Sequence, residues 1–209
     1  MKARIYMAYS ASATTPTVGG VYGTNDAGFG VQGESKSGRG VFGHSETGHA
    51  GFFDGNVHVT RNITVDGDIV LSNADCAEDF DTEDEGDAVL PGTVMVLGEG
   101  GALRRSDKPY DRRVVGVVSG AGRYKPGIVL DRQPNAERRR PIALFGKVYC
   151  QVDADHGPIE IGDLLTTSST LGHAMAVVDF ARMPGTMIGK AMGALASGRG
   201  LIPVLVTMR

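Results

Sequence analysis

The chain has 209 residues, and its 24 acidic and 21 basic side chains give a net charge of −3 at pH 7. Glycine contributes 31 residues, about twice its usual share, while tryptophan is absent and aromatic residues make up 6%. The charge excludes a strongly basic nucleic-acid-binding protein. Because no run approaches about 18 apolar residues, we expect no membrane span.

The first 18 residues are interpreted as a short N-terminal arm, in which Ile5 and Met7 could alternate on one side of a strand. The start lacks the apolar stretch of about 7–15 residues that a secretory signal requires, so we expect cytoplasmic synthesis. Cys76 and Cys150 lie far apart and form no C-x-x-C pair, which predicts reduced thiols. We expect no metal site and no cofactor.

Three near-copies of a ten-residue phrase come next: GVYGTNDAGF, GVQGESKSGR and GVFGHSETGH. A degraded fourth copy, AGFFDGN, begins at Ala50. A fixed period is typical of a repeat architecture. Glycine recurs at positions one, four and nine and valine at position two. The residues that define this pattern are Gly20, Val21, Gly23, Gly30, Val31, Gly33, Gly40, Val41 and Gly43.

Each copy is too short and too polar to fold alone. Ten extended residues span at most about 33–36 Å, roughly half of what one turn of a single-chain β-helix needs. Burying one valine yields about 1.5–3 kcal/mol, whereas ordering each residue costs about 1–2 kcal/mol. Two copies could form one turn of a thin solenoid, or three chains could each supply one wall per layer. We favour three chains, because the solenoid would have fewer than two turns. A flexible linker is the third alternative, but linkers do not place valine and glycine at fixed phase.

Residues 56–71 change to a six-residue rhythm in NVHVTRNITVDGDIVL. Apolar pairs two residues apart recur through this segment, so both members of a pair face one side of a strand. The pairs are Val57 and Val59, Ile63 and Val65, and Ile69 and Leu71. We therefore predict that residues 19–71 form a trimeric β-helix or β-prism stalk with a neck.

Residues 72–209 are predicted to form a β-barrel-like domain, because short β-branched segments alternate with turn signals. The expected strands are Thr93–Leu97, Val114–Ser119, Gly127–Leu130, Ile142–Val152, Asp163–Thr167, His173–Val178, Met187–Ala191 and Ile202–Met208. Similar segments recur 70–73 residues apart, which indicates two pseudo-two-fold halves. Single helical turns are expected at Ala74–Phe80 and Asp179–Met183.

Two charge blocks stand out in this domain. Eight acids lie between Asp75 and Asp87, and eleven basic residues lie between Arg104 and Arg140. A calcium loop is one reading of the acids, although Asp84 stands where an EF-hand requires glycine. Two other interpretations of the acids are a solvated charged surface and ion pairs between the two blocks, within one chain or across subunits.

Ser72 and Asp75, at the junction between stalk and domain, are the candidate catalytic residues. A serine near a carboxylate can attack a neighbouring peptide bond if a base takes its proton. The alternative for Ser-Asn-Ala-Asp is a helix N-terminal cap.

Several of these segments resemble the C-terminal domains of phage tail fibres and neck appendages. They are SNADCAEDF from Ser72, VVGVVS from Val114, ALFGKVYCQVD from Ala143 and GDLLTTSSTLGHAM from Gly162. The G-V-x-G repeats and the neck resemble the same family, so the resemblance covers about residues 20–209. It implies a homotrimeric stalk whose end domain sets the register of the chains. In some members the end domain then cuts itself off, with Ser72 and Asp75 as the implied cleavage residues.

We therefore expect a structural protein that is not a turnover enzyme and whose partner is itself, as a homotrimer. A self-cleaving serine protease acting once at the junction is the alternative. A fibre tip that binds a surface or glycan through Ser168–Gly172 and Asn135–Arg140 is another. Such a protein would belong to a virion or an extracellular particle, and it would contact a particle or cell surface but no nucleic acid.

Overall fold

The structure, a computed structural model, describes residues 23–83, 89–134 and 137–207. The predicted arm at residues 1–18 lies outside these ranges, as do Gly20, Val21 and residues 84–88 of the acidic block. Asn135, in one of the two proposed tip loops, also lies outside them. The chain divides into two compact units, Met1–Thr64 and Val65–Arg209.

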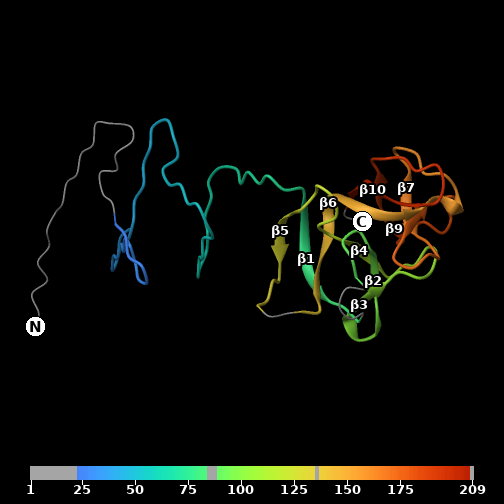
Figure 1. The fold of residues 1–209 in the computed structure, drawn as a ribbon, viewed down its shortest axis with the longest axis horizontal. Helices are drawn as coiled ribbons and strands as arrows, with labels where there is room; N and C mark the ends of the chain where they lie inside the picture. The colour runs from blue at the N-terminus through green and yellow to red at the C-terminus, as the bar shows by residue number, and fades with distance from the viewer. Residues whose placement is uncertain (1–22, 84–88, 135–136, 208–209) are drawn as a thin grey trace, which may run out of the picture. The chain divides into compact units, whose positions relative to one another are not determined.

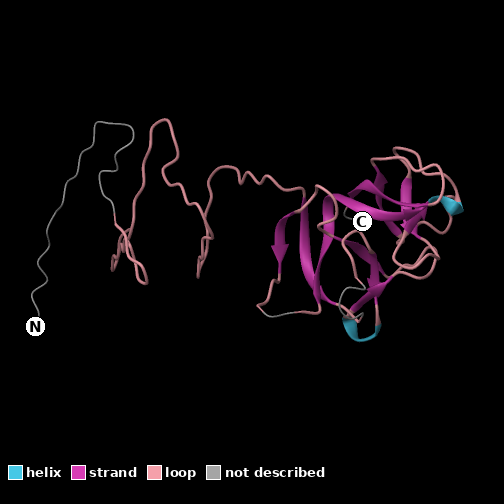
Figure 2. Cartoon of the chain, in the orientation of Figure 1, coloured by secondary structure: helices cyan, strands magenta, loops and turns pink. Residues whose placement is uncertain are grey.

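The first unit consists of a regular series of bends. Its described residues, 23–64, contain no strand and no helix (Figure 2). Three-residue bends recur at 26–28, 36–38 and 46–48, at the same positions of each decapeptide. The sequence repeat is therefore also a conformational repeat.

The second unit is all-β, as the sequence predicts, and the described part of the chain contains no α-helix (Figure 1). Its strands are β1 (Asp75–Asp81), β2 (Val94–Leu97), β3 (Leu103–Arg105), β4 (Val114–Val118), β5 (Pro126–Leu130), β6 (Arg139–Asp153), β7 (Leu164–Thr167), β8 (Ala174–Ala176), β9 (Met187–Ala191) and β10 (Arg199–Val206). Two single 3₁₀ turns, η2 (Glu99–Gly101) and η3 (Ala154–His156), interrupt them.

Five of the strands close into a barrel, in the order β10, β9, β7, β8 and β6, with β6 pairing back to β10. The long β6 strand makes closure possible because its 15 residues pair with several neighbours in turn. In its second half, every other side chain points inward: Val148, Cys150 and Val152 are fully buried. They lie in register with β10, where Val204 opposes Val148. This two-residue period gives the barrel a continuous aliphatic core.

The remaining strands extend the sheet from the first half of β6. β4 pairs with β6, β2 with β4, and β3 with β2. β1 lies between β6, which is antiparallel to it, and β5, which is parallel. A second core cluster fills this part of the domain: Val89, Met95, Leu103, Val118 and Ile142.

Two three-strand motifs repeat within the domain, which confirms the prediction of two similar halves. β2 pairs with β3 and β4, and β7 pairs with β8 and β9 in the same antiparallel manner. Each motif has a register shift directly after a residue that lies opposite a glycine. Met95 in β2 lies opposite Gly116 in β4, and Leu165 in β7 lies opposite Gly189 in β9. At both glycines a neighbouring backbone oxygen comes so close that a Cβ atom would lie 2.4 Å or less from it.

The two predicted helical turns are wrong. Asp75–Asp81 is strand β1, in which Asp75, Ala77 and Asp79 are buried and the residues between them are half-buried. Hydrogen bonding to β5 and β6 on both sides overrides the local capping signal of Ser-Asn-Ala-Asp. Residues 179–183 form a turn, because Asp179 Oδ1 accepts a hydrogen bond from the Ala181 N–H. Within the described ranges, no helix has the length and apolar character needed to cross a membrane.

Replacing Gly189 by alanine tests the close approach between β9 and β10. The new Cβ would lie 2.2 Å from the Leu205 carbonyl oxygen, so we expect the free energy of unfolding to fall by about 1–3 kcal/mol. Gly67→Ala is the matched control, because nothing lies within 4 Å of its Cβ position, and its effect should stay within about 0.5 kcal/mol. Denaturant unfolding of both variants measures the difference. Equal stabilities would contradict the packing described for Gly189.

Candidate functional site

Position six of each decapeptide closes a local loop, a role that the sequence analysis did not assign. Its side-chain oxygen accepts a hydrogen bond from the backbone N–H of the glycine at position nine. The pairs are Asn25 with Gly28 (2.7 Å), Ser35 with Gly38 (2.9 Å) and Ser45 with Gly48 (3.0 Å). Asparagine and serine commonly form such turns. The requirement for a short oxygen acceptor was visible in the sequence as Asn, Ser and Ser at one phase.

The glycine at position four marks where consecutive copies touch. A Cβ on Gly33 would lie 2.5 Å from the carbonyl oxygen of Gly40, the first residue of the next copy. Gly23 and Gly43 stand in the same relation to Gly30 and Ala50. Only glycine fits at such an approach, so the predicted structural role of these positions has a steric basis.

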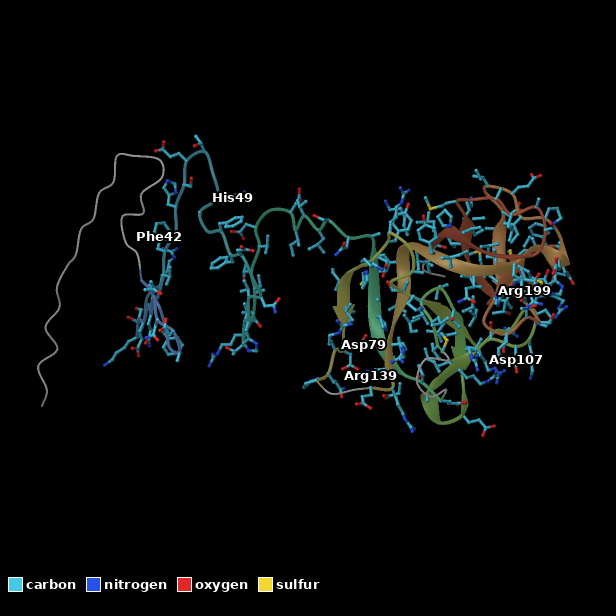
Figure 3. All side chains as sticks on the ribbon, in the orientation of Figure 1. Phe42, His49, Asp79, Asp107, Arg139 and Arg199 are labelled. Atoms are coloured by element: carbon cyan, nitrogen blue, oxygen red, sulfur yellow. The ribbon has the colours of Figure 1, made fainter. Side chains whose placement is uncertain are left out.

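The apolar side chains of the repeats have no cover within their own chain. Val31 is 72% exposed and Val41 is 77% exposed. Phe42 is also exposed, and Figure 3 shows it projecting from the backbone, as does His49. In addition, no backbone N–H among residues 23–64 donates to a backbone carbonyl of any residue that the structure describes. Apart from the side-chain caps at position six, one chain therefore gives the apolar side chains little cover and leaves this segment without backbone pairing among the described residues.

The neck follows its own six-residue period. Bends fall at 54–55, 60–61, 66–67 and 72–73. The first member of each apolar pair is more exposed than the second, as with Ile63 at 71% and Val65 at 46%. Ser72 and Asn73 thus form the fourth bend of the neck series, immediately before β1.

Asp75 is buried at the start of β1. Its Oδ2 accepts a hydrogen bond from Ser119 Oγ at 2.8 Å, whereas its buried Oδ1 has no partner among the described residues. Burial raises the pKa of the Asp75 carboxyl, and the Ser119 hydrogen bond offsets part of that rise. A buried carboxyl with a raised pKa can hold a proton under conditions in which an exposed carboxyl would lose it.

Ser72 lies apart from this hydrogen bond. It is exposed and lines a cavity of about 280 Å³ together with Arg123, Tyr124, Lys125 and Lys147. Asp75 lines a separate cavity of about 200 Å³. The serine that contacts Asp75 is Ser119, at the end of the VVGVVS segment, and sequence reasoning missed it because 44 residues separate the two.

Part of the acidic block pairs with the basic block inside one chain. Asp79 Oδ2 lies 3.1 Å from Arg132 Nε, and Arg139 contacts the carboxylates of Asp131 and Asp81. Figure 3 shows Asp79 and Arg139 near the same end of β1. Of the alternatives for the acids, pairing within the chain therefore holds for Asp79 and Asp81. Among the residues that the structure describes, no group of three His, Cys, Asp or Glu side chains could hold a metal ion.

Comparison with known proteins yields a likeness of fold. No protein-family model and no curated protein matches the sequence. The structure is similar to that of the pre-mature bacteriophage phi29 gene product 12, with a TM-score of 0.52 and 15% identity over 71% of this chain. The chain spans 24% of that protein's length. A C-terminal fragment of the same gene product matches 64% of this chain and 100% of the fragment, at 16% identity and a TM-score of 0.42.

The pH dependence of stability tests the environment of Asp75. Because its pKa is raised on folding, its contribution is favourable in acid and is lost as pH rises through the folded pKa. We expect Asp75→Asn, which can still accept from Ser119, to be more stable than the parent chain at pH 7 and to lose that advantage in acid. Chemical denaturation at several pH values between about 3 and 8 measures this.

Asp111→Asn is the control, for which we expect a stability change at pH 7 opposite in sign to that of Asp75→Asn. Hydrogen bonds from Arg113 lower the pKa of the Asp111 carboxyl, so its contribution is present at neutral pH and is lost as pH falls. This variant should therefore be less stable than the parent at pH 7. If both substitutions shift stability in the same direction at pH 7, the description of Asp75 is wrong.

Proposed function

We propose that this chain is a structural appendage protein of a bacteriophage, with a homotrimeric stalk and a C-terminal domain that sets chain register and caps the stalk. The observation that carries the proposal is the set of apolar side chains that recur at fixed positions and are exposed in one chain. They lie in a segment whose described residues make no backbone–backbone hydrogen bond with one another. The likeness of fold to a bacteriophage gene product is consistent with this assignment.

Three chains would supply what one lacks. Ordering ten residues costs about 10–20 kcal/mol, which one valine per copy cannot offset. Wound together, three copies bring their position-two valines to a shared interior and let neighbouring backbones pair. The hydrogen bonds at position six and the close contacts at the position-four glycine give every decapeptide the same conformation. Loops of equal shape from three chains could therefore stack in successive layers.

The C-terminal domain is suited to act as the register element. Its closed barrel has a core of its own, so it can fold within one chain. It also carries a row of cross-strand neighbours, Ile128, Cys76 and Phe145, around the apolar 200 Å³ cavity that Leu71 also lines. Ile128 and Phe145 are more than 40% exposed. We propose that neighbouring chains pack on this row and so align the three stalk segments.

Self-cleavage at the junction is the second candidate, and the buried Asp75 favours it. Its raised pKa and unpartnered Oδ1 would let it hold a proton beside the bend that carries Ser72. In this proposal Ser72 Oγ attacks the carbonyl carbon of the preceding peptide bond, and the hydroxyl proton passes by way of the Asp75 carboxyl to the departing Ser72 amine as the C–N bond breaks. Water then hydrolyses the resulting ester, which releases a fragment that begins at Ser72.

The chain number and its dependence on Val41 test the stalk proposal. Light scattering should give three times the mass of one chain. Val41→Asp places a charge in the shared interior of three chains, so the concentration at which the trimer dissociates should rise on the order of 100-fold or more. Thr47→Asp adds the same charge at a bend and should leave dissociation unchanged. A monomeric parent chain, or equal effects of the two substitutions, would contradict the proposal.

Mass spectrometry of purified protein tests self-cleavage. The proposal predicts a fragment that begins at or near Ser72, absent from Ser72→Ala and slower to form in Asp75→Asn. Ser119→Ala removes the hydrogen bond to Asp75 but not the attacking hydroxyl, so it should change the rate without moving the cleavage site. A full-length mass in every sample would remove this candidate.

A further inference from the structure

A cavity of about 330 Å³ lies between two segments of the domain that are distant in sequence. One segment leads into β4 and contributes Tyr110 and Arg112; the other, between β8 and β9, contributes Ala181, Arg182 and Pro184. The two segments lie beside each other near β9 (Figure 1). Both charged residues that line the cavity are arginines, and no carboxylate lines it.

Tyr110 joins the two walls of the cavity. Its phenolic oxygen accepts hydrogen bonds from the backbone N–H groups of Val178 (3.0 Å) and Asp179 (2.8 Å). Its backbone has φ of 58°, a conformation that a bulky residue seldom adopts. The Asp111 N–H, next in the chain, donates to Thr167 Oγ1 in β7. The position of the ring is therefore fixed from several sides.

Arg182 is held against this ring with most of its donors unused. Its guanidinium carbon lies 4.5 Å from the centre of the Tyr110 ring, and Nη2 donates to the Pro109 carbonyl at 3.1 Å. A guanidinium has five N–H donors, and this contact uses one of them. The stacking orients the planar group before any ligand arrives, which reduces the ordering cost of binding.

The second arginine is not neutralised by the protein. Arg112 makes no hydrogen bond or ion pair with any residue that the structure describes. The adjacent acid, Asp111, is held by Arg113, which donates from its backbone N–H and from Nη2. The acid of the opposite wall, Asp179, accepts from the Ala181 N–H. The cavity therefore carries two positive charges, and the acid next to Arg112, Asp111, is already paired with Arg113.

We propose that Arg112, Arg182 and Tyr110 bind the oxyanion group of a small acidic ligand: a carboxylate, sulfate or phosphate. Planar guanidinium groups bind such groups through paired, charge-assisted hydrogen bonds. The volume is at the lower end for ligand pockets, which fits a free anion or one acidic unit of a larger chain such as a polysaccharide. The site lies within a single chain and does not depend on the proposed trimer.

Calorimetric titration of the full chain with sodium sulfate, sodium phosphate and sodium acetate, at constant ionic strength set by chloride, tests the site. We expect saturable binding of at least one of these anions, with one site per chain. Arg112→Gln should weaken it about tenfold or more, because a hydrogen-bonded charge is lost. Arg112 is exposed and has no partner to lose, so this variant should fold as the parent does.

Lys108→Gln is the matched control. It removes the same charge from an exposed position four residues upstream that does not line the cavity, and it should leave affinity within about twofold. Arg182→Lys keeps the charge but loses the planar group, so it should also weaken binding. Equal affinities of the parent and Arg112→Gln would overturn the proposal.

A second set of titrations distinguishes a free anion from an acidic group carried on a polysaccharide. Dextran sulfate and alginate present sulfate and carboxylate groups on a chain, and neutral dextran is their control. Binding of a charged polymer that Arg112→Gln weakens, with neutral dextran inactive, supports an acidic unit of a polysaccharide. Binding of the free anions alone supports a small-anion site. Failure of all the anions and both charged polymers would overturn the proposal.

Discussion

Val31 and Val41 are mostly exposed in their own chain, whereas Val94, Val148 and Val152 of the C-terminal domain are completely covered. The difference between the two parts of the chain follows from this contrast in the burial of apolar side chains. The barrel closes on itself through the pairing of β6 with β10, so its apolar core is buried within one chain. The decapeptides are too short to do the same, and their regular loops leave Val31 and Val41 exposed, which in our proposal other chains cover.

The junction links these two modes of folding. The six-residue bends of the neck run up to Ser72 and Asn73, and β1 begins two residues later. There the chain enters a sheet with partners on both sides, and Asp75 is drawn into the interior beside Ser119. In the proposed trimer, a domain with its own core, attached to a segment without one, would bring three copies together in register.

Much of the C-terminal domain was predictable because its strands are short runs of β-branched residues between turn signals. The similarity of segments 70–73 residues apart also correctly predicted two similar halves, seen in the repeated pairing of β2 with β4 and of β7 with β9. The helical turn expected at Ala74–Phe80 failed, because the ladders to β5 and β6 are non-local and no local signal contains them. Ser119 was missed as the partner of Asp75, and Arg182 as the neighbour of Tyr110, for the same reason.

Hydrogen exchange of the backbone amides in residues 30–59, followed by mass spectrometry over a dilution series of the full chain, tests the central claim most directly. If sister chains complete this segment, its amides are protected while the protein is assembled and exchange at the rate of an unstructured chain once dilution separates the copies. The barrel amides should remain protected throughout. Protection of residues 30–59 that persists in a demonstrated monomer would contradict the account, because one chain would then be ordering this segment by itself.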